Sequence, residues 1–275
     1  MNLYHYTDQR GLIGIIGKKE LWATKIQYLN DDNEYRLAFK IAEKYLYEKI
    51  RYAKTDNIKF RIRRFIANFD SVGDMNICVC SLSENGDLLS QWRGYSTSLG
   101  GYSIGFNKET LIKNLDFAGF YLRQCVYLKS EQEEIIHAAI DKVLEEYKDY
   151  IEPHQKRNSE NCASESSRAF CNALSEISPT IKDQTFSEER EWRVISKGGI
   201  HFDKLDFREG RSMLTPYYRI ALNINIEDLI AEIIVGHTPN IGLAKSATQA
   251  FIYKEFMGMK RYPSLKVSSI PYRKW

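Results

Sequence analysis

The fold of this 275-residue chain is decided by the stretch Met75-Asn76-Ile77-Cys78-Val79-Cys80-Ser81-Leu82. The run is short, apolar and followed by turn residues, which is typical of a buried β-strand. Outward from it, we expect strands over 102–106 and 120–128, and then over 191–196, 200–207, 218–223, 231–236 and 266–270. Residues 200–207 are expected to be the hairpin partner of 191–196.

Helical patterns surround these strands. The chain begins with a strand over 3–6, a helix capped near Thr7 or Asp8 that stops at Gly17, and a strand over 21–23. Apolar residues recur at helical spacing around 37–47, 57–68, 131–150, 160–177 and 241–256. Strands at both ends with helices grouped between them predict an α+β fold, with a mostly antiparallel sheet and a helical insertion. We expect a single domain over 1–275, with a hinge only around 153–161.

Composition limits the class of protein. The 39 basic and 36 acidic residues leave a net charge of +3, which gives no large field to attract a nucleic acid or an anionic membrane. The five cysteines show no Cys-x-x-Cys spacing, so we expect reduced thiols and no metal. The N-terminus lacks the pattern of a signal peptide, and no apolar run approaches the ~18 residues that span a bilayer. We therefore expect a cytoplasmic protein.

The first polar cluster is His5-Tyr6-Thr7, at the end of the first strand. Alternation places His5 and Thr7 on one face and Tyr6 on the other. A histidine here could donate to a ribose hydroxyl or polarise a leaving group. The alternative is structural, with His5 tying down a backbone carbonyl and Thr7 capping the helix.

The second cluster follows the deciding strand. Ser81 lies at its end, and Trp92 and Tyr95 follow as an aromatic pair at i and i+3. The two rings could stack on a ligand ring or pack in the core. A further acidic turn over 30–34 could bind a cation, although capping of the next helix also explains it.

The third cluster, around Glu189-Arg190-Glu191-Trp192-Arg193, is the most unusual because charges precede an apolar strand. Alternation places Glu189, Glu191 and Arg193 on one face. Buried ions need partners, so burial of this face would indicate a function. Glu191 could stabilise an oxocarbenium-like centre or hold a ribose hydroxyl, with Arg193 moderating its charge. The alternative is a solvated edge strand with a surface ion pair.

Several ordered blocks resemble a bacterial family catalogued as domain of unknown function 2971 (DUF2971). They are Leu3-Tyr4-His5-Tyr6-Thr7, Leu21-Trp22-Ala23-Thr24, Leu29-Asn30-Asp31 to Glu34, Cys80-Ser81-Leu82-Ser83, Trp92 to Tyr95, Glu189-Arg190-Glu191-Trp192-Arg193, Thr215-Pro216-Tyr217, Ile234-Val235-Gly236 and Ile270-Pro271-Tyr272-Arg273. The resemblance spans nearly the whole chain. It implies a family and no activity.

A second resemblance is to the ADP-ribosyltransferase superfamily, whose sites combine an early His or Arg, a middle aromatic or hydroxyl residue and a late Glu. It implies a split-sheet fold in which His5 holds the adenosine-side ribose of NAD, Tyr95 stacks on the nicotinamide and Glu191 bonds the nicotinamide ribose. Glu189 resembles the first Glu of a Glu-x-Glu pair, which helps to activate the acceptor. The remaining residues of the implied NAD pocket are Tyr6, Thr7, Ser81, Trp92 and Arg193.

The resemblance therefore implies an enzyme that cleaves the nicotinamide–ribose bond of NAD and transfers ADP-ribose to a protein, a nucleic acid or a small molecule, as a toxin or antiphage defence effector does. The alternatives are a non-enzymatic nucleotide-sensing module and a hydrolase acting on NAD or nucleosides. All three need a pocket, so His5 and Glu191 must lie within the reach of one dinucleotide.

Overall fold

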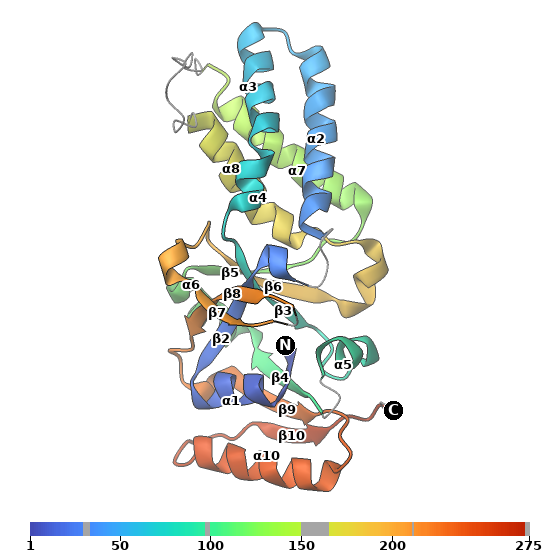
Figure 1. The fold of residues 1–275 in the computed structure, drawn as a ribbon, viewed down its shortest axis with the longest axis vertical. Helices are drawn as coiled ribbons and strands as arrows, with labels where there is room; N and C mark the ends of the chain where they lie inside the picture. The colour runs from blue at the N-terminus through green and yellow to red at the C-terminus, as the bar shows by residue number, and fades with distance from the viewer. Residues whose placement is uncertain (30–33, 97–99, 150–164, 211, 273–275) are drawn as a thin grey trace.

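The computed structural model describes residues 1–29, 34–96, 100–149, 165–210 and 212–272 (Figure 1). The described chain forms a mixed α+β fold with a mostly antiparallel sheet, which confirms the predicted class at that level. The strands are β1 (Asn2–Thr7), β2 (Glu20–Lys25), β3 (Cys78–Ser83), β4 (Tyr102–Asn107), β5 (Phe120–Gln124), β6 (Glu191–Ser196), β7 (Asp206–Glu209), β8 (Leu214–Ala221), β9 (Ile230–Val235) and β10 (Ser264–Val267). Their order is β10-β9-β4-β1-β3-β2-β8-β7, and β6 pairs with both β3 and β5.

The predicted strand β3 is the centre of this sheet. One of its edges pairs with β6 over five residues. Its other edge is shared, because β2 pairs near its start, at Thr24 and Val79, while β1 pairs near its end, at Tyr4 and Ser83. The strands β1 and β2 therefore part from each other alongside β3. We call the place where they diverge the strand gap.

The two faces of the sheet differ in chemistry. Cys78, Cys80 and Leu82 alternate onto one face, where they join the main core with Leu3 and Val194. Helices α1 (Gln9–Gly17), α6 (Lys108–Ala118) and α10 (Ile241–Glu255) contribute to the same core. The opposite face carries Ser81 and Ser83 of β3 beside the charged residues of β6, and we call it the polar face.

The predicted helical insertion is formed by two segments that meet in space. Helices α2 (Glu34–Tyr52), α3 (Asp56–Ala67) and α4 (Phe69–Asp74) precede β3, and α7 (Lys129–Glu146) and α8 (Glu165–Ile177) precede β6. They gather at one end of the molecule, around a second core that includes Leu46, Phe65 and Ile140 (Figure 1). The single-domain organisation stays a prediction.

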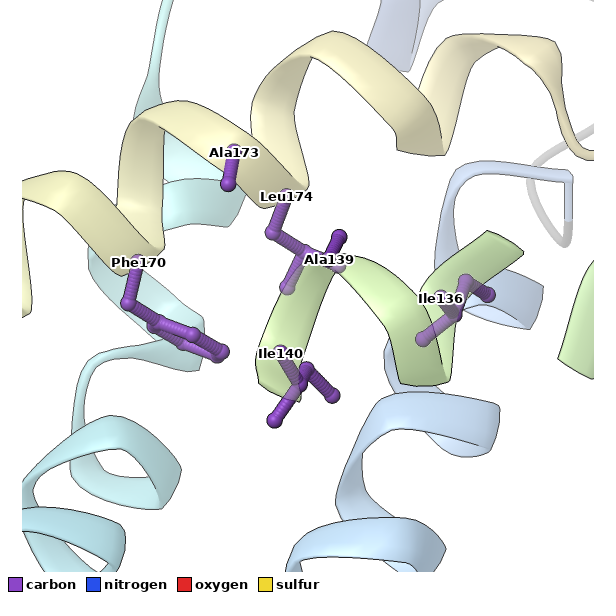
Figure 2. A pocket seen from close by; sticks show the side chains of 6 residues that line it. All are labelled: Ile136, Ala139, Ile140, Phe170, Ala173 and Leu174. Carbon is purple, nitrogen blue, oxygen red and sulfur yellow. The ribbon is translucent and has the colours of Figure 1, made fainter. Parts of the chain in front are cut away.

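One small pocket lies between α7 and α8 (Figure 2). Its lining consists of Ile136, Ala139, Ile140, Phe170, Ala173 and Leu174. These side chains are all hydrocarbon, so the pocket offers no polar group that could orient a substrate. It belongs to the packing between the two helices.

One expected pairing was wrong. Residues 206–209 form β7, which pairs with β8 and not with β6. Both edges of β6 are already occupied, by β3 and by β5. The acidic turn at 30–33 and the expected hinge around 153–161 lie outside the described residues. Within the described part of the chain, no helix is long and apolar enough to cross a membrane.

Candidate functional site

Glu191, the first residue of β6, lies inside a cage of two cations. As whole residues, Glu191 is only 4% exposed, and Lys182 and Arg193 are 4% and 1% exposed. Arg193 donates through Nε to Oε1 at 2.7 Å and through Nη2 to Oε2 at 3.1 Å. Lys182 donates to Oε2 at 2.5 Å. The interpretation of this segment as a solvated edge strand with a surface ion pair is therefore wrong, because the ions are buried.

Glu189 belongs to the same cage, but its position does not come from the strand alternation that was predicted. The strand begins only at Glu191, and Glu189 ends the 3-10 helix η3 (Gln184–Glu189). Arg190 between them adopts a left-handed backbone with φ 41°. This turn brings Glu189 onto Lys182, which donates to its carboxylate at 2.5 Å. The two carboxylates do converge, but through a turn and not through strand alternation.

Local hydrogen bonds hold this turn in place. The Ser83 hydroxyl donates to the Glu189 carbonyl at 2.7 Å, and the Glu191 amide donates to the Tyr127 hydroxyl at 2.8 Å. The Glu84 amide donates to the Arg190 carbonyl at 3.3 Å. A left-handed non-glycine residue persists where its surroundings impose it, and such strain is common at functional sites.

The strain at Arg190 gives a testable prediction. We expect Arg190→Gly to be more stable than Arg190→Ala by about 1 kcal/mol, because glycine adopts this conformation without a steric cost. The two variants remove the same exposed side chain, so their difference in urea denaturation isolates the backbone. Equal stability, or a more stable alanine variant, would contradict strain at this position.

The charge on Glu191 follows from its neighbours. Burial alone would raise the pKa of Glu191, but the charges and hydrogen bonds of Arg193 and Lys182 outweigh burial and lower it to about 2. The carboxylate is therefore ionised at any physiological pH. It can stabilise a positive charge but cannot act as a general acid.

Tyr95 lies within electrostatic reach of the two carboxylates. It ends helix α5 (Leu89–Tyr95), and its side chain is 40% exposed. Desolvation, together with the negative charges of Glu191 and Glu189, raises the pKa of Tyr95 to about 12. The phenol therefore keeps its proton and remains a hydrogen-bond donor beside the carboxylates.

His5 lies in the strand gap. Its Nδ1 is 2.9 Å from the Ser81 carbonyl, so Nδ1 carries the proton and Nε2 is an acceptor. The structural interpretation, in which His5 ties down a backbone carbonyl, is thus confirmed. Burial lowers the pKa of His5, Arg208 lowers it further, and the bond to Ser81 opposes both.

The Cys80 thiol lies 3.5 Å from the same His5 nitrogen. Burial raises the pKa of Cys80 to about 12, so this thiol stays protonated. The pair is neutral and is not a thiolate–imidazolium nucleophile.

His5 and Glu191 are not side by side. Tyr4 pairs with Ser83, and Ser83 pairs with Glu191, so these three residues share the polar face. His5 follows Tyr4 and alternates toward the opposite face, where its ring meets Cys80. Both residues border β3, His5 at one edge and Glu191 at the other.

Three other residues of the predicted NAD pocket, Tyr6, Trp92 and Thr7, pack against neighbouring parts of the protein. Tyr6 and Trp92 are 5% and 1% exposed, and their rings pack edge to face with centroids 4.8 Å apart. Trp92 also donates to Asp87 at 2.7 Å. Thr7 packs against Gly11, and the helix cap is Asp8 instead of Thr7. The structure therefore brings together Glu189, Glu191, Arg193 and Tyr95, with Ser81 paired to Arg193 on the same face.

Sequence reasoning missed two residues. Lys182 lies in an irregular segment with no motif, and only the need of two buried carboxylates for a cation indicates that such a residue must exist. Arg208, on β7, donates to the Thr24 hydroxyl at 3.0 Å and acts electrostatically on His5. The expected strand over 200–207 ends before Arg208 and was paired with the wrong partner, so the place of Arg208 beside the gap could not be predicted.

The class that emerges is an α+β protein with a mostly antiparallel sheet and a buried carboxylate that is paired with two cations. Residues 91–194 match a family model described as "Protein of unknown function (DUF2971)". This range includes Tyr95, Glu189, Glu191 and Arg193 and excludes His5. A search of curated proteins and a search of solved structures each found no match.

Proposed function

We propose that the chain is an ADP-ribosyltransferase-like enzyme that cleaves the nicotinamide–ribose bond of NAD, with Glu191 at the reacting sugar. The proposal rests on one observation: Glu191 is a buried carboxylate paired with two cations, and it lies within electrostatic reach of the exposed Tyr95. The parting of β1 and β2 alongside β3 supports the split-sheet architecture that the resemblance implies.

The chemistry needs a negative charge held near the sugar. The bond between C1′ and the nicotinamide nitrogen breaks, and its electron pair neutralises the pyridinium ring. C1′ is left as an oxocarbenium ion, which the Glu191 carboxylate stabilises. A nucleophile of the acceptor then bonds to C1′ and loses a proton. Glu189 is placed to take that proton, because its side chain is 16% exposed, compared with 5% for Glu191.

Tyr95 and His5 have separate roles in this proposal. The exposed Tyr95 ring offers a face for the nicotinamide, and its protonated hydroxyl can donate to the substrate. His5 does not touch the reacting carbon. It lies in the strand gap, where its neutral Nε2 can accept a hydrogen bond from a sugar hydroxyl on the distant part of NAD.

One observation favours a second candidate, a nucleotide-binding module without catalysis. Glu189 and Glu191 are balanced by Lys182 and Arg193, so the four side chains have no net charge. Both carboxylate oxygens of Glu191 already accept hydrogen bonds from cations. A balanced cage attracts an oxocarbenium ion less than a lone carboxylate would.

The test measures nicotinamide release from NAD in the presence of candidate acceptors. Because Glu191→Gln alone removes a negative charge from the buried cage and leaves both cations in place, the informative variant is the double substitution Lys182→Met with Glu191→Gln, which removes a charge of each sign. We expect its rate to fall at least about 100-fold. Glu188→Gln, an exposed neighbour in η3, is the matched control and should keep the wild-type rate.

The other outcomes separate the alternatives. Free ADP-ribose without a labelled acceptor indicates hydrolysis. Binding of NAD with no nicotinamide release supports the binding module and contradicts the enzyme. A double variant that remains folded and as active as the wild type removes Glu191 from the mechanism.

A further inference from the structure

Beside the strand gap lies a charged residue that the proposed function does not use. Arg208 lies on β7, and its guanidinium reaches across β8 to donate to the Thr24 hydroxyl on β2 at 3.0 Å. The Thr24 side chain is buried, at 7% exposure, whereas Arg208 is exposed. Among the described residues Arg208 has no carboxylate partner, although it lies close enough to lower the pKa of His5.

Arg219 makes the contrast clear. Arg208 and Arg219 share the polar face, and each guanidinium lies 6.0 Å from the centre of the Tyr217 ring. Arg219 is neutralised by Asp206, which accepts from its Nε at 2.9 Å and from its Nη2 at 3.1 Å. The two arginines therefore have similar positions over Tyr217, but only Arg219 has a carboxylate partner among the described residues. Only Arg208 offers an uncompensated fork of donors to an incoming anion.

The other groups around the gap define what can bind there. The Thr24 oxygen accepts from Arg208, so its own hydroxyl proton can be donated to a ligand. The Nε2 of His5 is an acceptor with no hydrogen-bond partner among the described residues, so it suits a hydroxyl and repels a phosphate oxygen. Trp22 packs on Tyr217 with ring centroids 4.5 Å apart, which adds an aromatic wall.

We propose that Arg208 and Thr24 form a phosphate-binding site at the strand gap, for the diphosphate of a nucleotide whose sugar hydroxyl is accepted by His5. The proposal rests on the proposed function in one respect: the diphosphate belongs to the same NAD molecule whose nicotinamide ribose lies at Glu191. Arg208 binds the phosphate oxygens as a fork, and Thr24 adds a short, buried donor. No catalytic role is assigned to either residue.

The experiment measures binding by calorimetry to the wild-type chain, with ADP, inorganic pyrophosphate and adenosine as probes. We expect ADP to bind, pyrophosphate to bind more weakly and adenosine to bind least. Arg208→Ala should weaken ADP binding at least about tenfold, and Arg208→Lys by less. Arg219→Ala, the matched control, should change ADP binding less than twofold. Thermal unfolding confirms that each variant is folded.

Several outcomes would overturn the site. They are equal losses in the two alanine variants, adenosine binding as tightly as ADP, no binding of any probe, or a single-stranded oligonucleotide that binds more tightly than ADP. The two proposals fail separately. ADP binding that needs Arg208, without any nicotinamide release, keeps the phosphate site and rejects the cleavage. Nicotinamide release with the same KM in wild type and Arg208→Ala keeps the cleavage and rejects the phosphate site.

Discussion

Replacing Glu191 by Gln is expected to lower the free energy of unfolding by about 3–5 kcal/mol, because it leaves a buried Lys and Arg without their carboxylate. Lys182 would keep Glu189 as a partner, whereas Arg193 would lose both of its hydrogen bonds to Glu191 and keep the one to the Pro179 carbonyl at 2.8 Å. Urea denaturation measures the loss. The exposed control Glu188→Gln should change the unfolding free energy by less than about 0.5 kcal/mol.

The double variant and the pH dependence sharpen this prediction. Lys182→Met combined with Glu191→Gln should be more stable than Glu191→Gln alone, because the double variant removes one charge of each sign and keeps the charge balance of the cage. The pKa of Glu191 is lowered from an ordinary 4.5 to about 2, so its contribution is complete above pH 4.5 and is lost as the pH falls toward 2. The deficit of Glu191→Gln should shrink over that range. A loss below about 1 kcal/mol at neutral pH would contradict an enclosed carboxylate.

Replacing Trp92 by Ala is expected to lower the free energy of unfolding by about 3–5 kcal/mol. The side chain is 1% exposed, packs against Tyr6 and donates to Asp87. The same carboxylate accepts from Ser268 at 2.5 Å and from the Ser269 amide at 2.7 Å, so it ties the C-terminal segment to α5. Removing Trp92 should therefore loosen the helix that positions Tyr95.

Tyr95→Ala is the matched comparison for Trp92, since both residues lie on α5 and only Tyr95 is exposed. It should cost less than about 1 kcal/mol of stability. Thermal and urea unfolding of the two variants separate packing from ligand stacking. If Trp92→Ala kept wild-type stability and lost only nucleotide affinity, Trp92 would be a binding residue and the packing account would be wrong.

Local patterns made much of the fold predictable. The helix after Asp8 was expected from its cap and from Leu12, Ile15 and Ile16, and it begins and ends where those residues indicate. The apolar run that contains Cys78 to Leu82 was correctly expected to be a buried strand. Periodicity and capping are encoded within a few residues, so a single sequence is enough to show them.

Strand pairing and the cage depended on contacts that are distant in sequence. Nothing near Glu191 specifies that β6 pairs with β3, more than 100 positions earlier, or that Lys182 turns inward. The face of His5 relative to Glu191 follows only from the pairing of Tyr4 with Ser83. A shift of one residue would reverse that relation, and the sequence does not fix such a register. The left-handed turn at Arg190 could not be predicted from the sequence either, because glycine is the residue that usually indicates this conformation.

The central claim is that Glu191 works as a permanently ionised carboxylate at the sugar of NAD. The most direct test is the rate of nicotinamide release by the folded wild-type chain as a function of pH. With the pKa of Glu191 at about 2 and that of Tyr95 at about 12, and with His5 neutral above its ordinary pKa of 6.5, we predict release at a rate that is constant from pH 6.5 into the mildly alkaline range. The absence of nicotinamide release at every pH from folded, NAD-saturated protein would contradict the account.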